Sequence, residues 1–126
     1  MVHRALNPAG APRPIAPYSP GIDTGNVVFV SGQIGADPAT GQLLDGVEAQ
    51  AERVLLNITA ILDSAGLTLA DVAKTMILLA DIADFDKVNA VYARFFSDPP
   101  PARSTFQVAA LPRGAQVEIE AIAVRR

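Results

Sequence analysis

The stretch QVEIEAIAV, residues 116–124, predicts both a strand and the surroundings of the sheet that contains it. Successive side chains of an extended strand point to opposite faces, so one face carries Val117, Ile119, Ala121 and Ala123. The other face carries Glu118, Glu120, Ile122 and Val124. Both faces are substantially apolar, so we expect each of them to be covered.

Three further stretches have the composition of strands. Residues 26–32, NVVFVSG, form a short β-branched run that ends in glycine, which favours a buried strand. Residues 72–80, VAKTMILLA, are apolar on both alternating faces in their second half, as in a central strand. Residues 104–111, STFQVAAL, precede QVEIEAIAV, and the LPRGA between them predicts a tight connection between two strands.

The most regular pattern in the chain predicts an amphipathic helix. Its apolar residues recur at steps of three and four: Val47, Ala51, Val54, Leu55, Ile58, Ile61, Leu62 and Ala65. We expect Asp45 to cap the start of this helix, with Glu48 in the reciprocal position, and Gly66 to end it.

A second, shorter helix is predicted after Asp84, which is a candidate N-cap. Its apolar face consists of Phe85, Val88, Tyr92 and Phe95. The SDPPPA of residues 97–102 ends the helix, because proline cannot continue it. Asn57 in the first helix and Asn89 in the second are typical of helix surfaces.

The predicted order is strands, helix, strand, helix, strand, strand, which indicates an α+β fold in a single domain, residues 1–126. Prolines are frequent near the N-terminus, so residues 1–15 are expected to be extended or turn-like. Two helices cover only one face of the sheet, so we expect the apolar opposite face to close against copies of the chain. A ring of subunits follows from this arrangement.

Composition argues against several classes of function. The formal net charge is −3 and the ten basic residues are scattered, so no nucleic-acid partner is expected. The chain has no cysteine and a single histidine, His3, which argues against a metal site and a Ser-His-Asp triad. It also has no run of 18 apolar residues and no start typical of a signal peptide. We therefore expect a cytoplasmic protein that does not contact a membrane.

Three segments carry polar groups where packing alone would not need them, and Tyr18 is considered beside them. Arg103 stands at the start of a strand and is either a rim charge or a fixed anion binder. Glu118, taken alone, is an ordinary solvated strand residue. The glycines of SGQIG, residues 31–35, let a ligand approach the backbone, but the motif is a weak signal. Tyr18, taken alone, is a packing aromatic.

Together these features carry a resemblance. The matching segments are APYSPG (16–21), VSGQIG (30–35), DFDKVNAVYARFF (84–96) and PPARSTFQVAALPRGAQVEIEAIAV (100–124). In order and spacing they closely resemble the Rid family, the reactive intermediate deaminases also called the YjgF family. The likeness runs from about residue 16 to the last residue, and its closing block is highly specific. It implies a chorismate-mutase-like fold, with a mixed sheet and two helices on one face, that forms trimers with clefts between subunits.

The resemblance also implies roles for individual residues. It places a substrate-binding arginine at Arg103, a water-positioning glutamate at Glu118 and a pocket tyrosine at Tyr18. Further ligand contacts are implied at Gly32, Phe85 and Asn89.

Two positions depart from the family pattern. Thr105 stands where many relatives have cysteine, so a substrate contact there is expected through the backbone and not through sulfur. Pro20, in IAPYSPG, removes one backbone donor near the pocket entrance.

The reaction implied by the resemblance is hydrolysis of 2-imino acids, such as 2-iminobutanoate and 2-iminopropanoate, and of their enamine tautomers. The products are 2-keto acids and ammonia. The planar guanidinium of Arg103 can donate two parallel hydrogen bonds to the carboxylate beside the C=N bond. A carboxyl group such as that of Glu118 can position a water molecule and transfer a proton. Tyr18 would close the pocket and offer a hydroxyl. Neither a metal nor an organic cofactor is required.

Two other classes of function stay open at this point. One is an endoribonuclease or translation inhibitor, against which the acidic balance counts. The other is a non-catalytic trimer that binds small carboxylates through the same arginine. Salt-dependent RNA binding tests the first, and turnover of an imine generated in situ tests the second.

Overall fold

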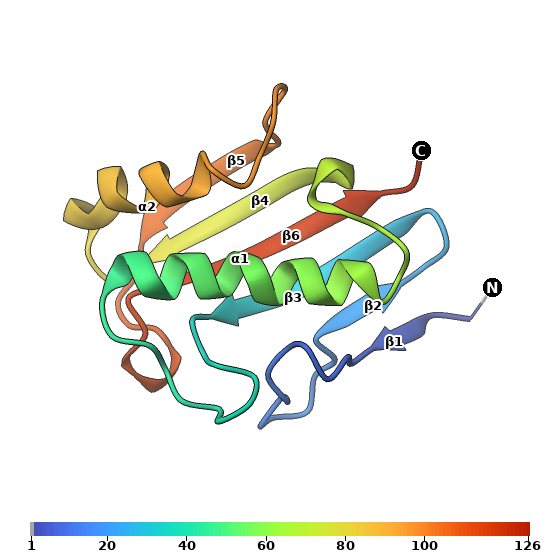
Figure 1. Cartoon of the computed structure of the whole chain (residues 1–126), viewed down its shortest axis with the longest axis horizontal. Helices are drawn as coiled ribbons and strands as arrows, with labels where there is room; N and C mark the ends of the chain where they lie inside the picture. The colour runs from blue at the N-terminus through green and yellow to red at the C-terminus, as the bar shows by residue number, and fades with distance from the viewer. Residues whose placement is uncertain (1) are drawn as a thin grey trace.

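The computed structural model describes residues 2–126, and Met1, the first residue of the predicted N-terminal segment, lies outside the described residues. In chain order the elements are β1 (Arg4–Leu6), β2 (Gly21–Asp23), β3 (Val27–Ile34), α1 (Val47–Asp63), β4 (Val72–Leu79), α2 (Phe85–Tyr92), β5 (Ala102–Gln107) and β6 (Val117–Val124). Both helices lie across the same face of one sheet (Figure 1). The predicted α+β fold with two helices on one face is therefore confirmed.

The sheet has the strand order β1-β2-β3-β6-β4-β5. Neighbouring strands are antiparallel except β4 and β5, which are parallel and are joined through α2. The sheet is therefore mixed, as predicted. β6 comes last in the sequence yet lies in the interior of the sheet, between β3 and β4.

The hydrophobic core lies between α1, α2 and the sheet. The predicted stripe of α1 is buried, and the strands add Val28, Ile77, Leu79, Val117 and Ile119, each fully buried. Burying one such side chain completely stabilises the fold by about 1.5–3 kcal/mol. Within residues 2–126 neither helix combines the length and the apolar character that crossing a membrane would require.

The alternation predicted for residues 116–124 is confirmed. The residues that face the helices are at most 2% exposed: Val117, Ile119, Ala121 and Ala123. Neither helix covers the opposite face of the sheet, which we call the open face (Figure 1). It presents Phe29, Phe106 and Val124 with 47%, 48% and 39% of their surface exposed. Apolar surface of this kind is typical of a protein–protein interface.

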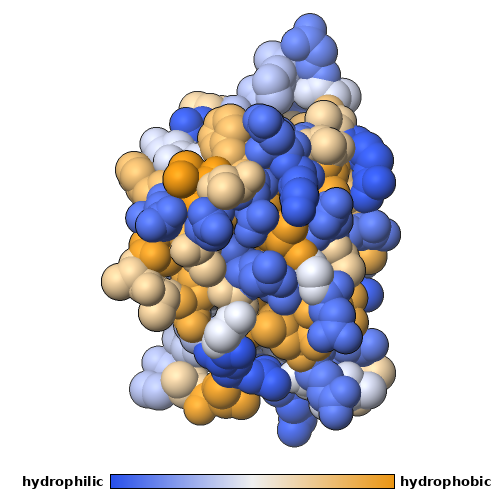
Figure 2. Space-filling model, turned by 90° about the vertical axis from the view of Figure 1, so that its left-hand side faces the viewer, coloured by the Kyte–Doolittle hydropathy of each residue, from blue (hydrophilic) through white to orange (hydrophobic). Residues whose placement is uncertain are grey.

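The end of the molecule toward which β3, β4 and β5 run has a different surface. Figure 2 shows this end, where hydrophobic patches are separated by hydrophilic residues. A mixed surface of this kind is compatible with contact with water. The open face is therefore the better candidate for contact with another copy of the chain.

The helix ends agree only in part with the prediction. α1 begins after Gly46, so Asp45 lies one residue too early, and no side chain caps the helix. Asp84 directly precedes α2, as predicted, but makes no capping hydrogen bond; the side chain of Asp81 caps the short 3₁₀ turn before it. Gly66 follows α1 with φ of 75°, the left-handed conformation in which glycine carries no steric penalty.

The predicted tight connection between the last two strands is wrong. β5 ends at Gln107, and residues 108–116 connect it to β6 through the 3₁₀ turn Pro112–Gly114. β5 and β6 are not paired with each other, because both pair with β4, one on each side of it. The connection must therefore cross the end of β4, which needs more residues than a hairpin turn.

Three features of the fold were not predicted. Residues Arg4–Leu6 and Gly21–Asp23 form two short strands, β1 and β2, that pair with each other, and β1 is the edge of the sheet. Asn57 is fully buried, so the surface interpretation of this residue is wrong. Its amide donates to the carbonyl of Ala36 at 3.0 Å, which holds the loop after β3 against α1.

A partly buried ion pair ties Arg125 to Asp23 of β2. Arg125 donates to both carboxylate oxygens of Asp23 at 2.8 Å and also to the carbonyls of Gly25 and Ala65. Arg4 donates to the same carboxylate at 3.2 Å. The hydrogen bond from Arg125, with that from the Gly25 N–H, holds the pKa of Asp23 well below its usual range although burial opposes this. This cluster joins β1, β2 and the end of α1 to the C-terminal residues.

Candidate active site

One group of predicted site residues lies on the open face of the sheet. Glu118 of β6 lies directly beside Gly32 of β3, where a Cβ would overlap the Glu118 carboxylate. These two residues and Tyr18 line a pocket of about 240 Å³, whose apolar wall includes Ile15 and Ile34. The structure thus brings Tyr18, Gly32 and Glu118 to one cavity.

A β-bulge explains the position of Gly32. The register between β3 and β6 shifts between Val30 and Gln33, so Ser31 and Gly32 lie in the irregular part of the strand. Bulges re-aim the residues that they contain and are frequent next to active sites. Here the bulge places a residue without a side chain against the carboxylate of Glu118.

Ser31 fastens the irregular segment that carries Tyr18. Its hydroxyl donates to the carbonyl of Ser19 at 2.6 Å, and its backbone N–H donates to the carbonyl of Pro20 at 2.9 Å. Pro20 lacks a donor but supplies this acceptor. The proline-broken segment is therefore fixed to β3 and presents Tyr18, 48% exposed, at the pocket.

The surroundings of Glu118 raise the pKa of its carboxyl. The main cause is desolvation by partial burial, and repulsion from Glu120 on the same strand adds to it. A carboxyl with a raised pKa holds and releases a proton closer to neutral pH than an ordinary glutamate does. This property is typical of residues that take part in proton transfer.

The second group of predicted residues lies on the helix face of the sheet. The guanidinium carbon of Arg103 lies 5.0 Å from the ring centroid of Tyr92 and 5.6 Å from that of Phe85. Arg103 and Asn89 line a cavity of about 450 Å³ together with Tyr92, Phe96, Pro100 and Pro101. Phe85, Asn89 and Tyr92 follow one another at steps of four and three, so α2 presents them on one face.

Arg103 differs from most of the arginines in its partners. Within residues 2–126 its guanidinium makes no hydrogen bond or ion pair, whereas Arg125 is held by Asp23 and Arg94 by Glu52. Aromatic faces hold a guanidinium without using its N–H donors. The fork of Arg103 is therefore available for an anion.

Thr105 lies two residues beyond Arg103 on the same face of β5. Its hydroxyl is buried and has no hydrogen-bond partner among residues 2–126. Thr105 lines neither the cavity of Arg103 nor that of Glu118. The structure therefore does not bring this predicted residue to either cavity.

Within one chain the two groups are not brought together. In the strand pairing Arg103 stands opposite Thr75, whose side chain is buried beneath α2, whereas Glu118 stands opposite Leu78. Arg103 and Glu118 therefore point to opposite faces of the sheet and line different cavities. A site that uses both residues requires a second copy of the chain.

Tyr92 lies beside Arg103 in the same cavity, although the sequence pattern predicted it only for the apolar face of the helix. Its hydroxyl lies 2.7 Å from that of Thr75, and both residues are buried. Burial raises the pKa of Tyr92, although the Thr75 hydrogen bond and the charge of Arg103 oppose the rise, so the phenol is protonated at neutral pH. The available signal was its spacing from Phe85 and Asn89.

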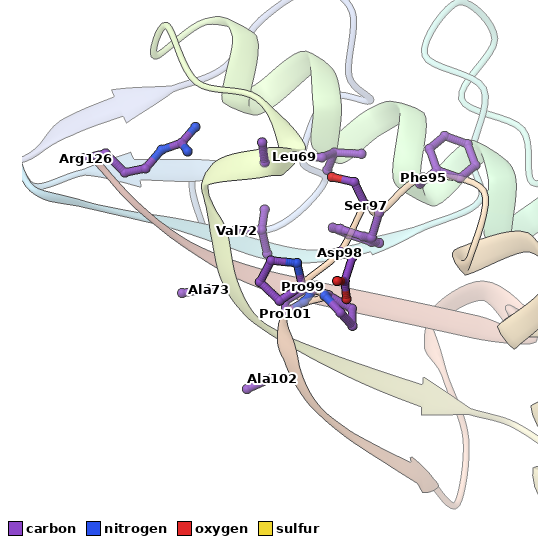
Figure 3. A pocket seen from close by; sticks show the side chains of 13 residues that line it. Leu69, Val72, Ala73, Phe95, Ser97, Asp98, Pro99, Pro101, Ala102 and Arg126 are labelled. Carbon is purple, nitrogen blue, oxygen red and sulfur yellow. The ribbon is translucent and has the colours of Figure 1, made fainter.

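Another cavity, of about 440 Å³, lies between residues 69–73 and the proline-rich segment 97–102 (Figure 3). Its two charged residues, Asp98 and Arg126, lie well apart in this view, and Arg126 donates to Asp71. None of the predicted site residues lines it. Without convergent polar groups, this cavity is a weaker candidate for chemistry than the two described above.

Comparison with known proteins finds relatives that match nearly the whole chain. The family model described as Endoribonuclease L-PSP matches residues 9–125. The chain is 50% identical to a protein named DfrA from Myxococcus xanthus, with 98% of this chain and 97% of the relative covered. It is 48% identical to the 2-iminobutanoate/2-iminopropanoate deaminase of Capra hircus, with 99% and 92% covered.

A solved structure gives the same result for the fold. The crystal structure of E. coli TdcF with bound serine superposes with a TM-score of 0.94 at 42% identity, covering 98% of this chain and 99% of that one. Sequence and fold agree over nearly the whole chain, as the resemblance predicted. The chain therefore belongs to the Rid, or YjgF, family, whose model carries the description Endoribonuclease L-PSP.

Proposed function

We propose that the chain is a deaminase that hydrolyses 2-imino acids, such as 2-iminobutanoate and 2-iminopropanoate, to 2-keto acids and ammonia. The names of several relatives that are 44–48% identical support this reaction. The observation that carries the proposal is the state of Arg103, whose fork lies against two aromatic rings with its donors available. A planar, permanently charged fork suits the carboxylate of a 2-imino acid.

The complete site lies between two copies of the chain in a homotrimer. The positions of Arg103 and Glu118 on opposite faces support this arrangement, as does the apolar open face. One copy supplies Arg103, Phe85 and Asn89, and its neighbour supplies Tyr18, Gly32 and Glu118. Thr105 contributes at most its backbone, because its hydroxyl is buried away from both cavities.

The reaction needs one water and one proton that is taken up and returned. Glu118 of one copy accepts a proton from the water as the water oxygen forms a bond to the imine carbon. The carbinolamine that results keeps its carboxylate on Arg103 of the other copy. With the imine nitrogen protonated at the start, Glu118 then returns its proton to the amine nitrogen of the carbinolamine and the C–N bond breaks to release ammonia. The one remaining hydroxyl proton passes to the Glu118 carboxylate and from there to solvent, which leaves the 2-keto acid.

The neighbours of Glu118 serve this chemistry. Gly32 leaves room for the carboxylate and for the substrate, because any side chain at this position would occupy the space. Tyr18 lies at the mouth of the same pocket and offers a hydroxyl to the ligand. Such imines are released by pyridoxal-phosphate enzymes that act on serine or threonine, so we expect the protein to act beside these enzymes in the cytoplasm.

The proposal is tested with an imine that is generated in situ. An amino-acid oxidase produces 2-iminopropanoate or 2-iminobutanoate, and the rate of keto-acid formation is measured with and without the protein. Acceleration by the wild type and its loss in Arg103→Ala support the deaminase. Binding of a 2-keto acid without acceleration would instead identify the trimer as a carboxylate-binding protein.

RNA cleavage is a second candidate, favoured by the description of the family model. The net charge of −3 argues against it, because RNA binding normally needs clustered positive charge. Incubation of the purified protein with a labelled RNA at low and high salt tests for RNA cleavage. Cleavage that persists in the Arg103→Ala and Glu118→Gln variants would place any such activity outside the proposed site.

A further inference from the structure

Arg103, Tyr92 and Thr75 form a compact unit on the helix face of the sheet. Thr75 of β4 stands directly opposite Arg103 of β5 in the parallel strand pair. Tyr92 of α2 contacts both, with its hydroxyl 2.7 Å from the Thr75 hydroxyl and its ring centroid 5.0 Å from the Arg103 guanidinium carbon. Three different elements therefore meet at the arginine.

The hydroxyl pair fixes the ring of Tyr92. Tyr92 is 6% exposed and Thr75 is 1% exposed, so separating their hydroxyls would leave two buried polar groups without partners. Phe85, the other ring beside Arg103, is 38% exposed and has no hydroxyl. Tyr92 is therefore the more firmly held of the two surfaces against which the guanidinium lies.

An arginine that binds a carboxylate needs its plane fixed while its charge and donors stay available. A carboxylate partner would fix the plane but would neutralise the charge and occupy the donors, as Asp23 does for Arg125. An aromatic face fixes the plane and leaves the donors at the edge of the guanidinium available. Packing of Tyr92 against Arg103 meets both requirements.

We propose that Tyr92, anchored by Thr75, is a positioning residue that orients the Arg103 guanidinium for the carboxylate of its ligand. The inference rests on the proposed function for the identity of that ligand, a 2-imino acid. Tyr92 does not act on the reacting atoms. Its effect passes through Arg103, and this dependence is what the experiment must detect.

The probe is 2-oxobutanoate, a stable 2-keto acid that carries the same carboxylate, with its affinity measured by calorimetry. Tyr92→Leu, which removes the ring, is expected to weaken binding about tenfold. Tyr92→Phe and Thr75→Val each remove one hydroxyl of the pair, and each is expected to weaken 2-oxobutanoate binding about threefold. The double variant is expected to bind no more weakly than either single variant, because both changes break the same contact. In an Arg103→Ala background, Tyr92→Leu is expected to cause no further loss.

The control is Val91→Ala, which removes a buried side chain from the same helix. It is expected to lower the denaturation midpoint and leave the affinity of the folded protein unchanged. Tyr92→Phe and Thr75→Val nearly preserve volume, so they test the inference even if Tyr92→Leu does not fold. Wild-type affinity in both of these variants, or an equal effect of Tyr92→Leu with and without Arg103, would overturn the inference.

The same measurements separate this inference from the proposed function. If the wild type binds 2-oxobutanoate through Arg103 and Tyr92 but does not accelerate imine hydrolysis, the deaminase proposal fails and the positioning role stands. If imine turnover depends on Arg103 while the Tyr92 and Thr75 variants bind and react like wild type, only the positioning role fails.

Discussion

Gly32 and Glu118 compete for one space on the open face of the sheet: a Cβ at position 32 would overlap the carboxylate and lie 2.8 Å from its Cδ. The obstructing group is the end of a flexible side chain, so Gly32→Ala should fold after Glu118 turns away. We expect a loss of imine turnover of at least about tenfold with little change in the denaturation midpoint.

The matched control is Gly66→Ala, at a glycine with φ of 75° where an added Cβ would have no atom within 4 Å. Here the strain acts on the backbone and is remote from Glu118, so stability should fall by about 1 kcal/mol while turnover stays normal. Urea unfolding and the coupled oxidase assay, applied to both variants, measure the two effects. Normal turnover in Gly32→Ala would show that the position of the carboxylate does not matter.

Arg103→Ala should lower the efficiency of imine turnover about ten- to several-hundred-fold, because a charge-assisted contact to the substrate carboxylate is worth about 1.5–3 kcal/mol. Arg103→Lys should restore little, since a point charge lacks the fork. The trimer mass should not change. Arg94→Ala, which breaks an exposed pair with Glu52, is the control and should have wild-type turnover. Full activity in Arg103→Ala would remove this residue from the site.

Mixed trimers test the proposed division of the site between copies of the chain in the proposed homotrimer. Subunits with Arg103→Ala and subunits with Glu118→Gln are each expected to form trimers with strongly reduced turnover. After the two are unfolded and refolded together, about one quarter of the sites should combine an intact Arg103 with an intact Glu118 from the neighbour. Light scattering confirms the trimer, and the oxidase assay measures the recovery. No recovery in trimers shown to be mixed would mean that both residues act within one subunit.

The pH dependence of turnover should report the raised pKa of Glu118. As a proton acceptor Glu118 must be ionised, so turnover is expected to rise with pH through a value above the usual range for glutamate. Glu120→Gln removes the nearby charge, lowers the pKa of Glu118 and should move this rise to lower pH. Glu118→Gln should slow turnover and leave 2-keto acid binding intact. If turnover of Glu120→Gln rises at the same pH as that of wild type, the rise reports the ionisation of another group.

Asp23→Asn should destabilise the fold most at neutral pH. The pKa of Asp23 is depressed in the folded state, so its ion pair with Arg125 stabilises the protein above the unfolded-state pKa of about 3.9. The stabilisation from this ion pair decreases as the pH falls below the unfolded-state pKa of Asp23 toward its lower folded-state pKa. Urea midpoints at neutral pH and near pH 3 should therefore differ more for wild type than for the variant. Glu52→Gln, in an exposed pair, should match wild type at both.

Local patterns in the sequence predicted most of the elements. The stripe of α1 and the alternation of β6 are visible because burial on one side repeats with the period of a helix or a strand. The tight connection predicted at LPRGA was wrong for a non-local reason. Strand composition does not show that β4, more than twenty residues earlier, inserts between β5 and β6.

The site could be predicted only in part for the same reason. Family resemblance named Arg103 and Glu118, but the face to which each points depends on strand pairing and register. Tyr92 and Thr75 looked like ordinary core residues in the sequence, because their hydroxyl contact joins a helix to a strand seventeen positions away. The burial of Asn57 depends on a carbonyl in another segment, which no helical pattern contains.

The interior position of β6 has a consequence for synthesis of the chain. Until residues 117–124 have left the ribosome, β1–β3 and β4–β5 are two sheet fragments with no strand to join them. Each fragment then presents an unpaired edge, β3 or β4, of the kind that pairs readily with other chains. Because residues 117–124 follow the other five strands in the chain, their pairing with β3 and β4 turns two aggregation-prone halves into one sheet.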